Sequence, residues 1–126
     1  MCDLDLSTRY AVHLPTPEQL THLHINLMLI GCGGTGSALA PSLARIAFHG
    51  QQKGIRFHII FVDPDIVEES NVGRQRFTPG AEVGFPKANC LATRLNLAFG
   101  LDIAAIATPF STELLNYFPE CPRSHT

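Results

Sequence analysis

A glycine-rich segment at residues 31–36, with the sequence GCGGTG, constrains the fold of this chain more than any other part of it. Its glycines have the spacing G-x-G-x-x-G, and they follow a mostly apolar run at residues 25–30. A short apolar run of this kind is typical of a strand that is buried on both faces of a parallel sheet. Glycines after such a strand allow a tight turn and let a phosphate approach the backbone at the start of the next helix. The segment therefore predicts a nucleotide-binding turn, with a mere packing turn as the alternative; its glycines are Gly31, Gly33, Gly34 and Gly36.

Strand and helix patterns alternate along the rest of the chain. We expect strands at residues 25–30, 56–62 and 102–107, and helical segments at residues 35–48, 86–99 and 111–118. Thr35 is expected to cap the first of these helices, and Pro41 is expected to bend it or break its first turn. The alternation of strands and helices predicts an α/β fold, a Rossmann-like wound parallel sheet.

The chain has the length of one domain, since its 126 residues fall within the usual size range of domains. We divide it into an N-terminal extension at residues 1–24, a nucleotide-binding domain at residues 25–118 and a tail at residues 119–126. Within the extension, Thr16 followed by Pro17 and Gln19 predicts the start of a short helix that ends at about Leu23.

Charge and composition exclude several classes of function. The chain has 9 basic against 11 acidic residues, so it lacks the positive charge that binds nucleic acids and anionic membranes. Its apolar runs are far shorter than the roughly 20 residues that span a bilayer, so we expect neither a membrane nor a nucleic-acid partner. The 4 cysteines form no C-x-x-C pair and no dense disulfide pattern, which favours the cytoplasm. The 6 histidines lack the spacing of metal ligands, so we expect no metal site made by the protein itself.

Polar residues follow the second predicted strand. Asp63 stands at its end, where an acidic side chain in a Rossmann-like fold accepts hydrogen bonds from a ribose; the alternative is that Asp63 and Pro64 only start a turn. Residues 64–86 form a long irregular stretch, and loops of this length inside a domain are usually functional. Cations and amides gather in and just after this loop, which suits either a bound anion or a solvated polar loop. They are Asn71, Arg74, Gln75, Arg76 and Lys87.

Four segments, in this order, resemble the nucleotide-binding half of the ThiF/MoeB/ubiquitin-activating-enzyme superfamily. They are residues 31–37 (GCGGTGS), 62–68 (VDPDIVE), 70–75 (SNVGRQ) and 83–88 (VGFPKA). The resemblance covers roughly residues 25–110. It implies a domain that binds ATP and Mg²⁺ and adenylates the C-terminal carboxylate of a ubiquitin-like or sulfur-carrier protein, with release of pyrophosphate. It also implies a homodimer.

The resemblance further implies roles for individual residues. Gly34 is expected against the nucleotide, and Asp63 is expected to hold the ribose. The residues expected around the phosphates are Ser70, Asn71, Arg74 and Lys87. Of these, Arg74 suits a bidentate grip on phosphate oxygens and Lys87 a point charge that follows the departing pyrophosphate, so both are expected to act in catalysis.

The sequence also departs from the family. The aspartate that holds Mg²⁺ in the family lies on a strand beyond residues 111–118 and has no counterpart here, so we expect an incomplete, truncated domain that binds ATP weakly and does not adenylate by itself. The zinc-binding cysteine pairs and the later nucleophilic thiol of some members are missing too, and Cys90 is expected in the core. Arg9 resembles the arginine of the family's entry segment, although that segment otherwise differs.

Two alternative functions remain open at the level of the sequence. The first is a nucleotide-binding or scaffold module without catalysis, which the missing Mg²⁺ aspartate favours. The second is an NAD- or FAD-binding oxidoreductase domain, which starts with the same glycine turn and acidic residue. The cations Arg74 and Lys87 argue against the second alternative, because a dinucleotide site needs no cation cluster at that place.

Overall fold

The computed structural model of the chain describes residue 16, residues 23–78 and residues 80–119. Within these ranges, three parallel strands form one sheet in the order β1-β2-β3. The strands are β1 (His24–Ile30), β2 (Arg56–Val62) and β3 (Ala104–Ile106). All three predicted strands are present, and the parallel sheet with helical crossovers confirms the predicted Rossmann-like α/β fold.

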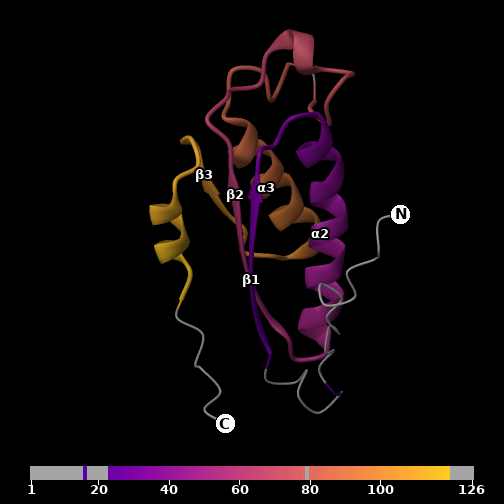
Figure 1. Cartoon of the computed structure of the whole chain (residues 1–126). Helices are drawn as coiled ribbons and strands as arrows, with labels where there is room; N and C mark the ends of the chain where they lie inside the picture. The colour runs from indigo at the N-terminus through magenta and orange to yellow at the C-terminus, as the bar shows by residue number, and fades with distance from the viewer. Residues whose placement is uncertain (1–15, 17–22, 79, 120–126) are drawn as a thin grey trace, which may run out of the picture.

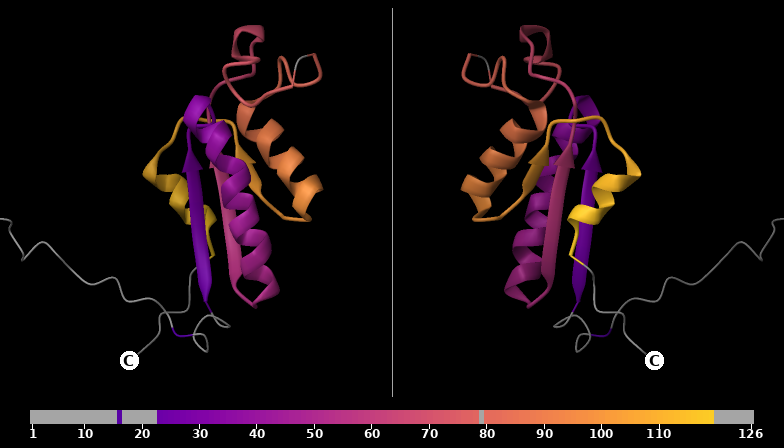
Figure 2. Two further views of the ribbon diagram at one scale, coloured as in Figure 1. Left: turned by 90° about the vertical axis from the view of Figure 1, so that its right-hand side faces the viewer. Right: turned by 90° about the vertical axis from the view of Figure 1, so that its left-hand side faces the viewer.

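Two long helices cover one face of the sheet, and a short 3-10 helix covers part of the other face (Figures 1 and 2). They are α2 (Gly34–Gln52), α3 (Lys87–Phe99) and the 3-10 helix η3 (Thr112–Tyr117). The loop between β2 and α3 contains a second 3-10 helix, η2 (Glu69–Asn71), and rises beyond the carboxyl ends of the strands (Figure 1). In the described part of the chain, no helix has both the length and the hydropathy needed to cross a bilayer.

The main core lies between the sheet and the two long helices. Side chains of β2 alternate, so that Ile59 and Phe61 face the helices, whereas Ile60 and Val62 pack against Leu114 of η3. The buried residues of α2 on its sheet side include three alanines, which let the helix lie close to the strands: Ala40, Ala44 and Ala47. Cys90 of α3 belongs to the same core, as the sequence predicts.

Strand β3 is shorter than the predicted span of residues 102–107. The side chain of Asn96 on α3 hydrogen-bonds with both main-chain polar groups of Ile103. Its Oδ1 accepts from the Ile103 N–H at 2.7 Å, and its Nδ2 donates to the Ile103 carbonyl at 3.0 Å. The ladder with β2 therefore begins only at Ala104.

Helix α2 differs from its prediction at both ends. It begins at Gly34 with Gly33 as N-cap, so the expectation that Thr35 is the cap is wrong. The carbonyl of Gly33 accepts the first helical hydrogen bond, from the N–H of Ser37 at 2.8 Å, and no side chain caps the first turn. The helix continues through Pro41 to Gln52, so Pro41 does not break it.

Other sequence predictions fall outside the residues that the structure describes. They are the short helix that follows Thr16 and the tail beyond Pro119. The division into extension, domain and tail stays a prediction. The last predicted helical segment, residues 111–118, is present as η3.

The turn between β1 and α2 requires glycine at two positions. Gly31 has a φ of 95°, in the left-handed region that side chains disfavour. At Gly36, a Cβ atom would stand 1.8 Å from the carbonyl oxygen of Gly31. The first turn of α2 therefore lies directly against the end of β1, and this contact brings the N-terminus of the helix to the carboxyl edge of the sheet.

We predict that Gly36→Ala destabilises the fold by about 1–3 kcal/mol, because the added methyl group forces the helix away from the strand end. Gly34→Ala is the matched control, since a Cβ at Gly34 would meet no atom within 4 Å. Urea unfolding measures both variants. A Gly36→Ala midpoint equal to that of the wild type would contradict this packing.

Candidate nucleotide-binding site

The buried carboxylate of Asp63 ties the glycine turn to the end of β2. Asp63 is 5% exposed, and its Oδ2 accepts a hydrogen bond from the main-chain N–H of Cys32 at 2.7 Å. Its Oδ1 accepts from the main-chain N–H of Asp65, also at 2.7 Å. The N–H of Gly31 donates to the Val62 carbonyl at 2.8 Å, which adds a second link between the two strand ends. Each oxygen of Asp63 keeps a further lone pair, and its role as ribose ligand stays a prediction.

Lys87 is the first residue of α3, and its side chain is almost completely buried. Its main-chain N–H donates to the Asp65 carbonyl at 3.0 Å. The side chain is 8% exposed, and its ammonium lies 4.0 Å from Oδ2 of Asp65. That distance is too long for a hydrogen bond, and among the described residues the ammonium has no hydrogen-bond acceptor. A cation on a largely buried side chain, with only this long ion pair to Asp65, favours a second anion as its partner.

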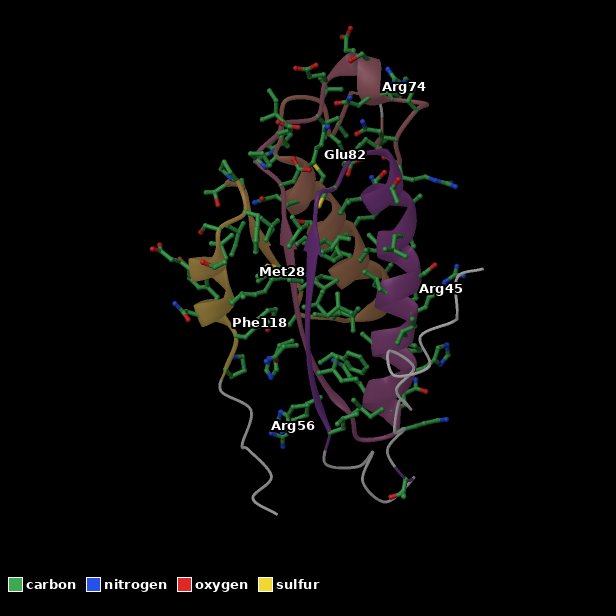
Figure 3. All side chains as sticks on the ribbon, viewed as in Figure 1. Met28, Arg45, Arg56, Arg74, Glu82 and Phe118 are labelled. Carbon is green, nitrogen blue, oxygen red and sulfur yellow. The ribbon has the colours of Figure 1, made fainter. Side chains whose placement is uncertain are left out.

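A cleft with a volume of about 650 Å³ opens beside the N-terminus of α2. Gly34 and Ala38 of α2, residues 73–78 of the loop and Arg94 of α3 line it. No acidic side chain is among these lining residues, while three arginines are. The first turn of α2 has no side-chain cap and contributes partial positive charge to the same space. Arg74 lies at the carboxyl end of the sheet, on the side of the loop (Figure 3).

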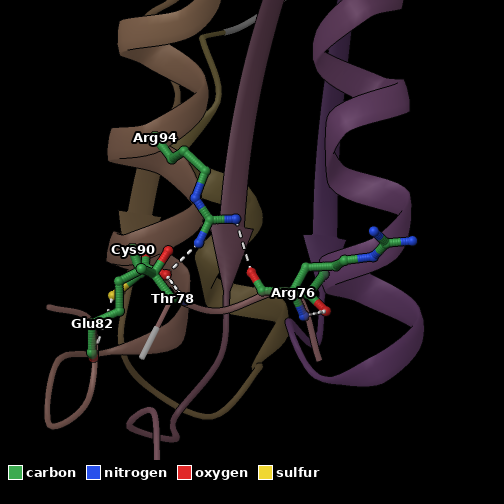
Figure 4. Close-up of polar contacts among 6 residues, drawn as sticks. Arg76, Thr78, Glu82, Cys90 and Arg94 are labelled. Atoms are coloured by element: carbon green, nitrogen blue, oxygen red, sulfur yellow. Dashed lines mark hydrogen bonds and ion pairs between the residues drawn. The ribbon is translucent and has the colours of Figure 1, made fainter. Parts of the chain in front are cut away.

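Side chains from both long helices hold the loop in place over the sheet. Oγ of Ser37 on α2 accepts from the main-chain N–H of Arg76 at 3.1 Å. The guanidinium of Arg94 on α3 donates to the Arg76 carbonyl at 2.8 Å and pairs with the carboxylate of Glu82 (Figure 4). Glu82 in turn accepts from the main-chain N–H of Thr78.

The structure brings only some of the predicted site residues together. Gly34 and Arg74 line the same cleft. Lys87 lies with Asp65 at the end of β2, and Lys87 is not among the residues that line the cleft. Gly33 lies beside the side-chain amide of Gln75. If Gly33 carried a Cβ atom, that atom would stand 3.8 Å from Nε2 of Gln75.

Ser70 and Asn71 lie in η2, and their described contacts are local. Oδ1 of Asn71 accepts from the main-chain N–H of Glu68 at 2.8 Å, which closes the loop at this turn. Ser70 is exposed. Contact of these two residues with phosphates stays a prediction.

The sequence patterns give no role to Ser37 or Arg94, although both shape the cleft. The spacing of Arg94 could have indicated its position. It lies seven residues after Lys87, which is about two helical turns, so both residues fall on one side of α3. For Ser37 no such signal exists, since its partner Arg76 is 39 residues away in the sequence.

The two cysteines that the structure describes are free, buried thiols. Burial, helped by the charge of Asp63, raises the pKa of Cys32 to about 12, while Lys87 acts in the opposite direction. Burial and the nearby Glu82 raise the pKa of Cys90 as well. Both thiols are therefore protonated at neutral pH and serve packing rather than nucleophilic chemistry.

Comparison with known proteins places these features in a family. The sequence profile of the ThiF family matches residues 7–120. No curated protein matches the chain significantly. E. coli MccB crystallised with ATP is 24% identical, with a TM-score of 0.56, over 82% of this chain and 29% of that chain. MccB crystallised with MccA-N7isoASN is 25% identical, with a TM-score of 0.56, over 82% of this chain and 28% of that chain. The E. coli tRNA N6-threonylcarbamoyladenosine dehydratase TcdA is 25% identical, with a TM-score of 0.57, over 80% of this chain and 38% of that chain.

The chain thus spans less than two fifths of the length of each of these solved proteins. Their likeness to it agrees with the fold described above. The family profile covers far more than half of the 126 residues. This chain belongs to the ThiF family.

Proposed function

We propose that this chain is the ATP-binding domain of an enzyme that adenylates the C-terminal carboxylate of a ubiquitin-like or sulfur-carrier protein. The observation that carries the proposal is the side chain of Lys87, which is only 8% exposed and whose ammonium lies 4.0 Å from the Asp65 carboxylate, too far for a hydrogen bond. An ATP phosphate would supply a hydrogen-bond acceptor. Membership of the ThiF family supports the proposal, and so does the existence of MccB crystals with ATP.

The described residues fit a nucleotide. The space above Gly34 is open, because a Cβ there would meet no atom within 4 Å, so a phosphate can approach the backbone. Arg74 lines the cleft beside Gly34 and has no described partner for its guanidinium. We assign Gly34, Arg74 and Lys87 to the phosphates and Asp63 to the ribose.

The proposed reaction needs positioning and positive charge more than covalent help from the protein. A carboxylate oxygen of the carrier protein attacks the α-phosphorus of ATP, a new oxygen–phosphorus bond forms, and the bond to the β-phosphate breaks. Pyrophosphate leaves with the electron pair of that bond. Arg74 offers two parallel N–H donors to phosphate oxygens, and Lys87 offers a compact charge to the departing group.

The described residues do not by themselves fit a Mg²⁺ site. In the described ranges, no three Asp, Glu, His or Cys side chains gather in a way that could hold a metal ion. Asp63 accepts from two main-chain N–H groups, and Asp65 is paired with Lys87. Ligands for Mg²⁺ would therefore have to come from outside these residues.

We predict that Arg74→Ala and Lys87→Ala each weaken ATP binding about ten- to a hundredfold, since a charge-assisted contact with a phosphate contributes about 1.5–3 kcal/mol. AMP should lose less affinity than ATP, because its single phosphate lies at the glycine turn. Isothermal titration calorimetry measures both nucleotides.

Arg45→Ala is the matched control for these variants. Arg45 is an exposed arginine on α2, away from the glycine turn (Figure 3). The Arg45→Ala substitution should leave the affinities for ATP and for AMP unchanged. Equal losses for ATP and AMP would mean that Arg74 and Lys87 do not bind the β- and γ-phosphates, and binding of NAD in preference to ATP would favour an oxidoreductase domain.

We predict further that the 126-residue chain binds ATP without exchanging pyrophosphate into it, because the described residues lack a set of ligands for Mg²⁺. A longer form that carries an aspartate for Mg²⁺ on a further strand should exchange pyrophosphate when a carrier protein is added. A panel of carriers that end in Gly-Gly serves as substrate. Robust exchange by the chain alone would refute this prediction, and no exchange by the longer form would favour a binding module without catalysis.

We also propose that the chain forms a homodimer. On the sheet face opposite the helices, η3 and the adjoining Phe118 pack against the strands, and Ile30 at 54% and Leu115 at 49% are exposed. Apolar side chains exposed in this way favour association. Multi-angle light scattering at micromolar concentration should give the mass of a dimer, and the mass of a monomer would contradict the proposal.

A further inference from the structure

Both main-chain polar groups of Arg76 are held by side chains of the two long helices. The N–H donates to Oγ of Ser37 on α2 at 3.1 Å, and the carbonyl accepts from the guanidinium of Arg94 on α3 at 2.8 Å (Figure 4). These partners lie 39 and 18 residues away in the sequence. An irregular loop residue is thereby fixed relative to both helices, so its side chain starts from a defined position.

The three arginines that line the cleft differ in how their charges are compensated. Arg94 pairs with the carboxylate of Glu82, so it braces the loop and adds little net charge. In contrast, the guanidinium groups of Arg74 and Arg76 have no described hydrogen-bond or ion-pair partner, and both residues are exposed. Two uncompensated positive charges therefore face a cleft whose lining contains no acidic side chain.

Gln75, which stands between these two arginines in the sequence, has a polar atom without a partner. Its Oε1 atom is buried and has no hydrogen-bond partner. A buried amide oxygen left without a donor costs about 1–3 kcal/mol, and native structures rarely keep such groups without a bound partner. The donor that this oxygen lacks would be a water molecule in the cleft, because the oxygens of an oligophosphate accept hydrogen bonds and do not donate them.

We propose that Arg76 and Arg74 form a two-arginine clamp for an oligophosphate, which is the pyrophosphate portion of ATP or free inorganic pyrophosphate. Each guanidinium matches a phosphate group with two parallel N–H donors. This proposal rests on the proposed function and deepens it, because it assigns the β- and γ-phosphates to the cleft beside Gly34. It also makes Arg76, which lies outside the four segments that resemble the family, a phosphate-binding residue.

Calorimetry with inorganic pyrophosphate, ATP and AMP tests the clamp. Arg76→Ala should weaken binding of pyrophosphate and of ATP about tenfold, the loss expected for one charge-assisted contact. The affinity of Arg76→Ala for AMP should stay within about twofold of the wild-type value, since AMP lacks the two outer phosphates. Arg76→Lys keeps the charge but not the two parallel donors, so it should fall between Arg76→Ala and the wild type. The control Arg45→Ala should change none of the three affinities.

The outcomes separate this inference from the proposed function. Pyrophosphate binding that depends on Arg76 would support the clamp even if the chain failed to bind ATP. ATP binding that is lost in Lys87→Ala but unchanged in Arg76→Ala would leave the proposed function standing and overturn the clamp. A wild-type chain that binds no pyrophosphate would overturn it as well. Circular dichroism of Arg76→Ala should match the wild type, because the exposed side chain can be removed without touching the main-chain contacts.

Discussion

The carboxylate of Asp63 is the contact on which the candidate site depends. It lies at the end of β2, buried, and accepts hydrogen bonds from the main-chain N–H groups of Cys32 and Asp65. A buried carboxylate is costly unless such donors surround it. Because the N–H of Cys32 belongs to the glycine turn, the same contact sets the position of Gly34 and the start of α2. The main-chain carbonyl of Asp65 accepts from the N–H of Lys87, the first residue of α3. The Asp63 carboxylate, by holding Asp65, therefore also sets the position of Lys87.

From this anchor, the site divides into two neighbouring parts. One part is the end of β2, where Lys87 is buried beside Asp65. The other is the cleft at the N-terminus of α2, where Arg74 and Arg76 carry uncompensated charge. Helix α3 serves both parts, since Lys87 lies at its start and Arg94, seven residues later, braces the loop.

The sequence predicts the fold well where a local pattern carries the information. Strand β2 and the end of α3 at Gly100 follow directly from apolar runs and a glycine stop. The pattern fails where a distant side chain competes for the backbone. Asn96 shortens β3 by taking both main-chain groups of Ile103, and no local signal reports this contact. Gly33 replaces Thr35 as the cap for a related reason, because the close contact of Gly36 with Gly31 sets where the helix begins.

For the site, the sequence indicates the residue types but not their grouping. Arg74 and Lys87 stand out as cations near a glycine turn, yet only the structure shows that one lines an open cleft and the other is buried. Ser37 and Arg94 hold the main chain of Arg76, which is distant from both in the sequence. No spacing signal reports Ser37, and the spacing of Arg94 from Lys87 indicates only that the two share one side of α3. The most direct test of a nucleotide site at the glycine turn is an NMR titration of the ¹⁵N-labelled chain with ATP. The amide signals of residues 33–36 and 74–76 should shift together with a single dissociation constant, and shifts confined to other residues, such as the exposed Phe85 and Leu97, would contradict a nucleotide site at the glycine turn.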